Sequence, residues 1–221
     1  MNIFLESLMR NRSGKKFNNY AYLNKTYYFA MTKKVLFTFL TILLIACQTQ
    51  NPQVRINTNQ GDMQIELYPQ KAPITVKNFL SYVDAGKYSG AEFYRVVTLK
   101  NQPDKNIKIE VIQGGLEFRM NIDTIPGIEH ETTDKTGIRH KDGTISMARN
   151  TPGSASSEFF ICIGSQPELD YGGKRNPDGQ GFAAFGKVLT GMEVVRRIQK
   201  MSADSNQILF EKVKILSVER E

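Results

Sequence analysis

A single arginine, Arg95, interrupts the otherwise apolar stretch FYRVV at residues 93–97. Aromatic and β-branched residues favour strands, in which side chains alternate between two faces. We therefore expect Arg95 to share a face with Phe93 and Val97. Charged side chains are seldom buried unless they are paired. Two interpretations stay open from this stretch alone: an edge-strand arginine whose guanidinium reaches water, or an arginine that serves a functional site.

Other reactive residue types show no spacing that predicts catalysis or metal binding. His130 and His140 lie in a polar stretch, and the sequence contains no HExxH or CxxC motif, so we expect no metal site. Cys162 lies in the apolar stretch EFFICIG, which favours a buried structural thiol over a nucleophile. The stretch GSAS at 153–156 lacks the G-x-S-x-G pattern of a nucleophile elbow, which argues against a serine hydrolase.

The elements that must position Arg95 are mostly strands. Turn residues separate eight candidate strands, at 54–58, 63–68, 92–97, 107–113, 143–149, 158–164, 182–189 and 211–219. Helical spacing of Val76, Phe79, Leu80 and Val83 predicts one helix, and a second is expected within 191–201. Eight strands with two helices predict a mainly β protein, a closed antiparallel barrel capped by two α-helices. The charged connection from 116 to 142 is expected to run over the surface.

The net charge of +7 is concentrated at the N-terminus. Residues 1–46 contain seven Lys or Arg and one acid, which leaves 22 of the 29 basic and 21 of the 22 acidic residues in the rest of the chain. The body is therefore nearly neutral. A basic stripe is the usual mark of a nucleic-acid-binding protein, so we expect no nucleic-acid partner.

Residues 31–46 have the pattern of a signal peptide: two lysines, then an apolar run that is too short to span a bilayer. Its end, LIAC, resembles the lipobox of bacterial lipoproteins, which implies lipidation of Cys47 and a membrane anchor. An ordinary cleaved signal with an incidental cysteine remains the alternative. Residues 47–53 would be a lipidated linker. Residues 1–30 fit no part of a signal peptide, so we expect translation to begin at Met31 and 1–30 to be a mis-assigned start or a disordered extension.

The motifs FYRVV, VIQGG, GTISMARN, SSEFFICIG and GFAAFGKVLTGMEVV occur in this order along the chain. In this order they resemble the cyclophilin family of peptidyl-prolyl cis/trans isomerases, and the likeness defines a domain over 54–221. It implies the eight-stranded cyclophilin barrel with two capping helices, and a reaction that needs no cofactor. With the signal peptide, it implies a monomer in the bacterial cell envelope that assists the folding of exported proteins. Its partners would be proline-containing unfolded or nascent polypeptides.

The resemblance implies roles for individual residues. Arg95, Gln113 and Phe160 match the family's catalytic positions, where the arginine donates a hydrogen bond to the prolyl nitrogen as the amide twists. Such a bond exists only in the transition state, so it lowers the barrier. The substrate-binding positions are expected to be Val111, Ala148, Arg149, Asn150, Glu158, Leu169 and Phe182. The three at 148–150 would pair their backbone with the peptide.

Several residues depart from the family's usual pattern. Glu110 and Val111 replace Phe-Met, which predicts a smaller and more polar pocket wall. Glu158 replaces a glutamine, and we expect its carboxylate to face Arg95 and pair with it. Glu168 replaces the tryptophan associated with cyclosporin binding, which predicts weak inhibition by that drug. The connection between Arg95 and Gln113 is longer than usual.

Two rival functions remain open at this stage. A cyclophilin-like peptide-binding module or holdase with little activity would account for acids at 110, 158 and 168. A barrel that stores an apolar ligand, in the manner of lipocalins, fits the strand count, but the order of the motifs argues against it.

Overall fold

The computed structural model describes residues 50–117 and 124–221. The predictions for the extension at 1–30, the signal peptide at 31–46 and lipidation at Cys47 therefore lie outside the described residues. None of the helices within the described ranges is long and apolar enough to cross a membrane.

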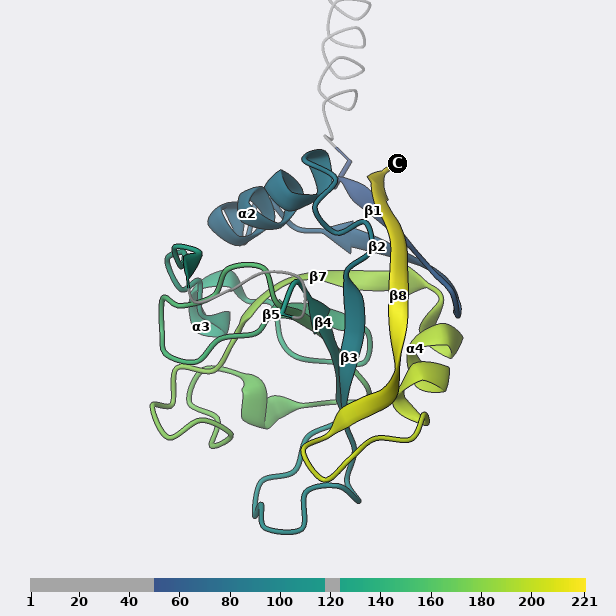
Figure 1. Ribbon diagram of the computed structural model, residues 1–221. Helices are drawn as coiled ribbons and strands as arrows, with labels where there is room; N and C mark the ends of the chain where they lie inside the picture. The colour runs from purple at the N-terminus through teal and green to yellow at the C-terminus, as the bar shows by residue number, and fades with distance from the viewer. Residues whose placement is uncertain (1–49, 118–123) are drawn as a thin grey trace, which may run out of the picture. The chain divides into compact units, whose positions relative to one another are not determined.

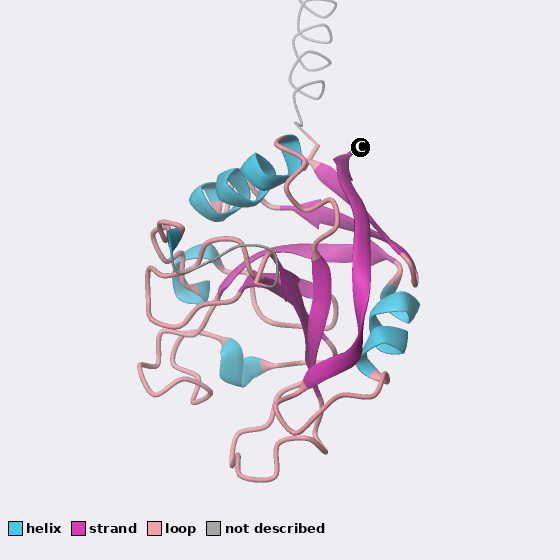
Figure 2. Cartoon of the chain, in the orientation of Figure 1, coloured by secondary structure: helices cyan, strands magenta, loops and turns pink. Residues whose placement is uncertain are grey.

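Eight antiparallel strands close into a barrel, as predicted (Figures 1 and 2). The order around the barrel is β1-β2-β7-β5-β6-β4-β3-β8. The bounds are β1 Gln53–Thr58, β2 Gly61–Leu67, β3 Glu92–Val97, β4 Val111–Gly115, β5 Thr144–Met147, β6 Phe159–Cys162, β7 Ala183–Thr190 and β8 Ile208–Arg220. Closure places β3 between β4 and β8, so residues at the start of β8 lie beside Arg95 although they are far away in the sequence.

Helix α2 (Pro73–Asp84) carries the predicted apolar face, with Pro73 in its first turn. Phe79 is fully buried, and its ring centroid lies 5.3 Å from that of Tyr88 and 5.6 Å from that of Phe159. The exposed N–H groups at the start of a helix need acceptors. Here the distant side chain of Glu131 supplies them, because its carboxylate accepts from the N–H groups of Ile74 and Thr75.

The described part of the 116–142 connection does not simply run over the surface, so that expectation was wrong. Glu131, Thr133 and His140 are buried, and the short helix α3 (Thr133–Thr136) packs against β7. Polar side chains are buried here because they satisfy one another and the start of α2.

Helix α4 (Met192–Gln199) is the second predicted helix; it buries Val194, Val195 and Ile198. It lies on the opposite side of the barrel from α2 (Figure 1). A short 3-10 helix, η3 (Pro167–Leu169), precedes the loop that leads into β7. The sequence did not predict α3 or η3.

A β-bulge in β3 changes which side chains face the barrel interior. Phe93 pairs with Gly114 and Arg95 with Gln113, so Tyr94 is an extra residue without a partner on β4. An extra residue interrupts the strict alternation of side chains. Phe93 consequently belongs to the main core, whereas Arg95 lies on the outer face, and the prediction that the two share a face was wrong.

Strand β4 begins later than predicted, at Val111 rather than at 107. The reason is the buried carboxamide of Gln102, which binds the backbone of Ile109 at both its N–H and its carbonyl group. Backbone groups satisfied by a side chain are not available for a strand ladder. The connection 98–110 is therefore an ordered loop built around Gln102.

Candidate functional site

One cleft on the outer face of the barrel collects the residues singled out from the sequence. Its volume is about 580 Å³. All ten predicted catalytic and substrate-binding residues line it: Arg95, Val111, Gln113, Ala148, Arg149, Asn150, Glu158, Phe160, Leu169 and Phe182. Six further lining residues were not predicted: Ile109, Glu117, Ser154, Ser156, Arg175 and Asn176.

The guanidinium of Arg95 is held by two carboxamides. Its Nη1 donates to Oε1 of Gln113 at 2.9 Å, and its Nε and Nη2 donate to Oε1 of Gln207 at 3.2 and 2.6 Å. Burial lowers the pKa of Arg95, but an arginine side chain stays protonated in proteins. A guanidinium has more N–H donors than the three used here, so Arg95 can still donate to a substrate.

Glu158 does not pair with Arg95, so the predicted direct contact was wrong; the described residues contain no such ion pair. The link is indirect. Nε2 of Gln113 donates to the Tyr94 hydroxyl at 2.7 Å, and that hydroxyl donates to Oε2 of Glu158, also at 2.7 Å. The other carboxylate oxygen accepts from the backbone N–H of Leu116. A continuous hydrogen-bonded path therefore joins Arg95 to Glu158.

The electrostatic setting of this path follows from its burial. Burial raises the pKa of Glu158, although the hydrogen bonds from Tyr94 and Leu116 act in the opposite direction. Burial, and then the charge of Glu158, raise the pKa of Tyr94. Gly115 permits this arrangement, because a Cβ at that position would overlap the Glu158 carboxylate.

Apolar side chains form the floor beside Arg95. Phe160, Val111 and Leu169 belong to a small core cluster outside the barrel interior, and Phe182 packs against it. The rings of Phe160 and Phe182 meet edge to face with centroids 5.3 Å apart. A concave apolar surface of this kind suits a proline ring. Cys162 lies beneath it, and burial raises the pKa of its thiol, in keeping with a structural role.

His140 supports Phe160 from behind, since their rings stack with centroids 5.9 Å apart. Its Nδ1 lies 2.8 Å from Asp170 Oδ1, and its Nε2 lies 3.0 Å from Ser146 Oγ. These contacts resemble a hydrolytic triad. However, Ser146 is 0% exposed and His140 is 1% exposed, so a substrate cannot reach the hydroxyl. His140, Asp170 and Ser146 therefore form a buried hydrogen-bonded cluster that packs against Phe160 through the His140 ring.

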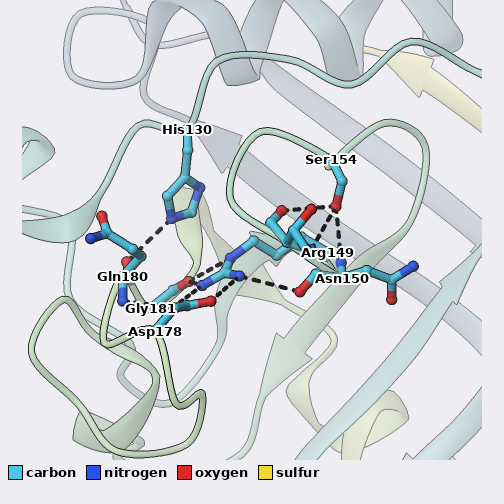
Figure 3. Close-up of polar contacts among 8 residues, drawn as sticks. His130, Arg149, Asn150, Ser154, Asp178, Gln180 and Gly181 are labelled. Atoms are coloured by element: carbon cyan, nitrogen blue, oxygen red, sulfur yellow. Dashed lines mark hydrogen bonds and ion pairs between the residues drawn. The ribbon is translucent and has the colours of Figure 1, made fainter.

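The side chain of Arg149 binds the loop 171–181 through several hydrogen bonds (Figure 3). Its guanidinium donates to both carboxylate oxygens of Asp178, at 2.8 and 2.9 Å, and to the carbonyl oxygen of Gly181. It also lies over the Phe182 ring, 5.2 Å from the centroid. His130 adds a contact from the other side, because its Nε2 is 3.2 Å from the Gln180 carbonyl oxygen. Arg149 thus positions the loop and Phe182.

The backbone of 148–150 is only partly available for pairing with a peptide. The N–H of Ala148 donates to the carbonyl oxygen of Glu158, and that of Asn150 donates to Ser154 Oγ. Within the described part of the chain, the N–H of Arg149 makes no hydrogen bond. An added strand would therefore use the backbone of Arg149.

Two of the acids that seemed to make the cleft more polar do not line it. Glu110 accepts a hydrogen bond from Gln199 of α4, and Glu168 accepts one from the backbone N–H of Lys174. Val111 does line the cleft, as expected. The case for a non-catalytic binding module rested partly on these acids, and it is correspondingly weaker. In the described part of the chain, no group of three or more His, Cys, Asp or Glu side chains could hold a metal ion.

Sequence reasoning missed Tyr94, Gln207 and Arg175. Nothing in the sequence signals the bulge that makes Tyr94 an extra residue of β3. Gln207 has a φ of 72°, which is rare for a residue other than glycine. Arg175 lies in the loop YGGKRNPDGQG at 171–181, whose fold no pattern in its sequence predicts.

Comparisons with known proteins agree with this geometry. Residues 53–220 match the family model described as cyclophilin type peptidyl-prolyl cis-trans isomerase/CLD. The chain belongs to the cyclophilin family. It is 34% identical over 183 residues to "Peptidyl-prolyl cis-trans isomerase A" of Dickeya dadantii, covering 79% of this chain and 88% of the relative. It is 35% identical over 195 residues to a peptidyl-prolyl cis-trans isomerase of Acinetobacter baylyi, covering 86% and 96%.

Solved structures show the same fold. A cyclophilin-type isomerase of Cryptosporidium parvum superposes with a TM-score of 0.61 at 25% identity, covering 77% of this cyclophilin and 98% of that chain. A second crystal structure from the same organism was determined in the presence of the dipeptide Ala-Pro. The protein described here is a peptidyl-prolyl cis-trans isomerase.

Proposed function

We propose that this cyclophilin is an envelope lipoprotein that isomerises X–Pro bonds in exported polypeptides, with Arg95 as its catalytic residue. The observation that carries the catalytic assignment is the position of Arg95: a guanidinium fixed by Gln113 and Gln207 at the edge of an apolar pocket. A proline ring in this pocket would bring its nitrogen within reach of the remaining N–H donors.

The chemistry needs only one well-placed donor. Rotation about an X–Pro bond is slow because it removes amide resonance, at a barrier of about 18–20 kcal/mol. In the twisted transition state the prolyl nitrogen has a lone pair that the planar ground state lacks. Arg95 donates to that lone pair and so binds the transition state more tightly than the substrate.

A comparison of Arg95→Ala with wild type tests the catalytic assignment. The measurement is the cis-to-trans rate of a short Ala-Pro peptide, followed by NMR exchange with a fragment that begins at residue 48. Loss of one preorganised donor typically lowers turnover by about 10²- to 10³-fold. Lys105→Ala, in an exposed part of the loop 98–110, is the matched control and should keep the wild-type rate. An equally active Arg95→Ala protein would rule out this role.

The proposed location rests on the sequence of 31–47. The apolar run after two lysines fits a signal peptide, and Cys47 follows it in a lipobox-like sequence. Acylation there would tether the isomerase domain through the linker 47–53, so that newly exported, unfolded chains are its substrates. Neither cofactor nor ATP is needed, which suits work outside the cytoplasm.

Expression of the full gene in a bacterium that processes lipoproteins tests the location. Wild type should incorporate labelled fatty acid and sediment with membranes, whereas Cys47→Ser should do neither. The mass of the mature protein distinguishes the alternatives. A chain that begins at an acylated Cys47 supports the proposal, and an unmodified mature chain refutes it.

A further inference from the structure

A second guanidinium, that of Arg175, lines the same cleft as Arg95. It comes from the loop 171–181, which also supplies Asn176 to the lining. Burial, and then the positive charge of Arg95, lower the pKa of Arg175. Like charges that converge on one cleft are costly unless an anion joins them.

Arg175 is held from behind by the loop 98–110. Its Nη1 donates to Oε1 of Gln102 at 2.9 Å and to the carbonyl oxygen of Ile107 at 2.7 Å. Gln102 is only 2% exposed, and its Nε2 also binds the carbonyl oxygens of Thr98 and Ile109. A buried anchor of this kind fixes the base of the guanidinium, and its other N–H groups remain for a partner in the cleft.

Among residues 50–117 and 124–221, no carboxylate neutralises this pair of cations. Within residues 50–117 and 124–221, neither Arg95 nor Arg175 forms an ion pair. Arg149 differs in this respect, because its guanidinium is paired with the carboxylate of Asp178 through two hydrogen bonds. The two acids of the cleft, Glu117 and Glu158, are not paired with Arg175, and Glu158 already accepts hydrogen bonds from Tyr94 and the backbone.

From this geometry we infer that Arg175 selects substrates with a carboxylate beside the proline. The acidic side chain of a neighbouring residue would accept hydrogen bonds from Arg175 and supply the negative charge that the described residues do not supply. This inference rests on the proposed function, since it assumes that X–Pro peptides are isomerised in this cleft. It names the substrate class: acidic proline-containing sequences.

A matched set of tetrapeptides tests the inference. The residue just before or just after the proline is Ala, Glu or Lys, and NMR exchange gives kcat/KM without a coupled protease. At low salt we expect wild type to prefer Glu over Ala at one of these positions by about three- to tenfold, the range for one partly desolvated ion pair. The preferred position shows which side of the proline faces Arg175. Raising the salt to about 0.5 M should reduce the preference, because screening shortens the range of the interaction.

The decisive variant is Arg175→Gln, read out as the ratio of kcat/KM for Glu and Ala peptides. We expect this ratio to fall to about one, whereas Arg175→Lys should keep part of it because it keeps the charge. Lys174→Gln is the control: it removes the same charge from the next residue, which is exposed and does not line the cleft, and it should keep the wild-type ratio.

The outcomes separate this inference from the proposed function. Isomerisation of the Ala peptide without a preference for Glu would overturn the inference alone, and so would an undiminished preference in a folded Arg175→Gln protein. Failure of wild type to isomerise any peptide of the set would overturn the proposed function itself.

Discussion

The carboxamide of Gln207 lies against the guanidinium of Arg95, and its Oε1 accepts from both Nε at 3.2 Å and Nη2 at 2.6 Å. The Nε2 of Gln207 donates to the carbonyl oxygen of Asn101, so the loop 98–110 holds the carboxamide in place. Gln207 adopts a left-handed backbone conformation with a φ of 72°. Strain of this kind persists where the surroundings enforce it, often at functional sites. Gln207 is therefore a positioning residue for Arg95.

Gln207→Ala should lower kcat by about tenfold and change KM little, because a hydrogen bond to a charged group contributes about 1.5–3 kcal/mol and orients a group that acts in the transition state. In an Arg95→Ala background the same substitution should have no further effect on kcat. Steady-state kinetics of the two single variants and the double variant measure this coupling. Asn206→Ala, at the exposed neighbouring position, is the control. Additive losses in the double variant would show that Gln207 acts on stability and not through Arg95.

Glu158→Gln should lower turnover severalfold by reorganising the path from Arg95. Both oxygens of the carboxylate can accept hydrogen bonds, and one accepts from the Tyr94 hydroxyl. The glutamine side chain of the variant has one oxygen that accepts and one NH2 group that can only donate. In one orientation of the carboxamide the Tyr94 hydroxyl would face two donors, since Gln113 also donates to it, and in the other the NH2 group would face the backbone N–H of Leu116. Tyr94→Phe, which removes the hydroxyl and keeps the ring, should have a similar effect, and Glu129→Gln at an exposed position should have none. Unchanged turnover in both site variants would mean that the path does not affect catalysis.

The same carboxyl group should make stability depend on pH. Burial raises the pKa of Glu158 above its usual value of 4.5, so the folded protein binds this proton more tightly than the unfolded chain does. Its contribution to stability is full below that usual value and is lost as the pH rises through the higher pKa of the folded state. Urea unfolding from about pH 4 to pH 7 should show the free energy of wild type falling relative to that of Glu158→Gln. A constant difference between the two proteins over this range would contradict the assignment.

The ion pair between Arg149 and Asp178 should weaken in acid. Hydrogen bonds from Arg149 lower the pKa of Asp178 from 3.8 to about 2. The stabilisation is present above the ordinary pKa and is lost as the pH falls from 3.8 towards 2. The difference in unfolding free energy between wild type and Asp178→Asn should therefore shrink over this interval. Asp104→Asn, at an exposed position in the loop 98–110, should show no such trend. A trend equal to that of Asp178→Asn would argue that the ion pair between Arg149 and Asp178 is not its cause.

Arg149→Lys should raise KM more than it lowers kcat, because Arg149 holds Phe182 in the wall of the pocket and does not contact the reacting atoms. A lysine keeps the charge but cannot bind both oxygens of Asp178 in a fork or lie flat over the ring. Steady-state kinetics with an Ala-Pro peptide measure the changes in KM and kcat separately. A variant with wild-type KM would show that the loop 171–181 keeps its position without the guanidinium.

Much of the fold could be predicted from local patterns. The alternation of apolar residues and the turn residues between them located eight strands, and the spacing of Val76, Phe79, Leu80 and Val83 located α2. The order of the motifs, compared with the family, also identified the ten residues that now line one cleft. These features are determined by residues close together in the sequence, or by a pattern that a whole family shares.

Only the tertiary structure decided which side chains of the cleft contact and hydrogen-bond to one another. The bulge at Tyr94 depends on how β3 pairs with β4, and Gln207 reaches Arg95 because barrel closure brings the start of β8 beside β3. Glu158 turns to Tyr94 and the backbone of Leu116, and not to Arg95, because those donors surround it in the folded chain. Arg175 enters the cleft because the buried side chain of Gln102 holds it there. Side-chain partners so distant in the sequence are set by packing and by the need to satisfy buried polar groups, which no local pattern encodes.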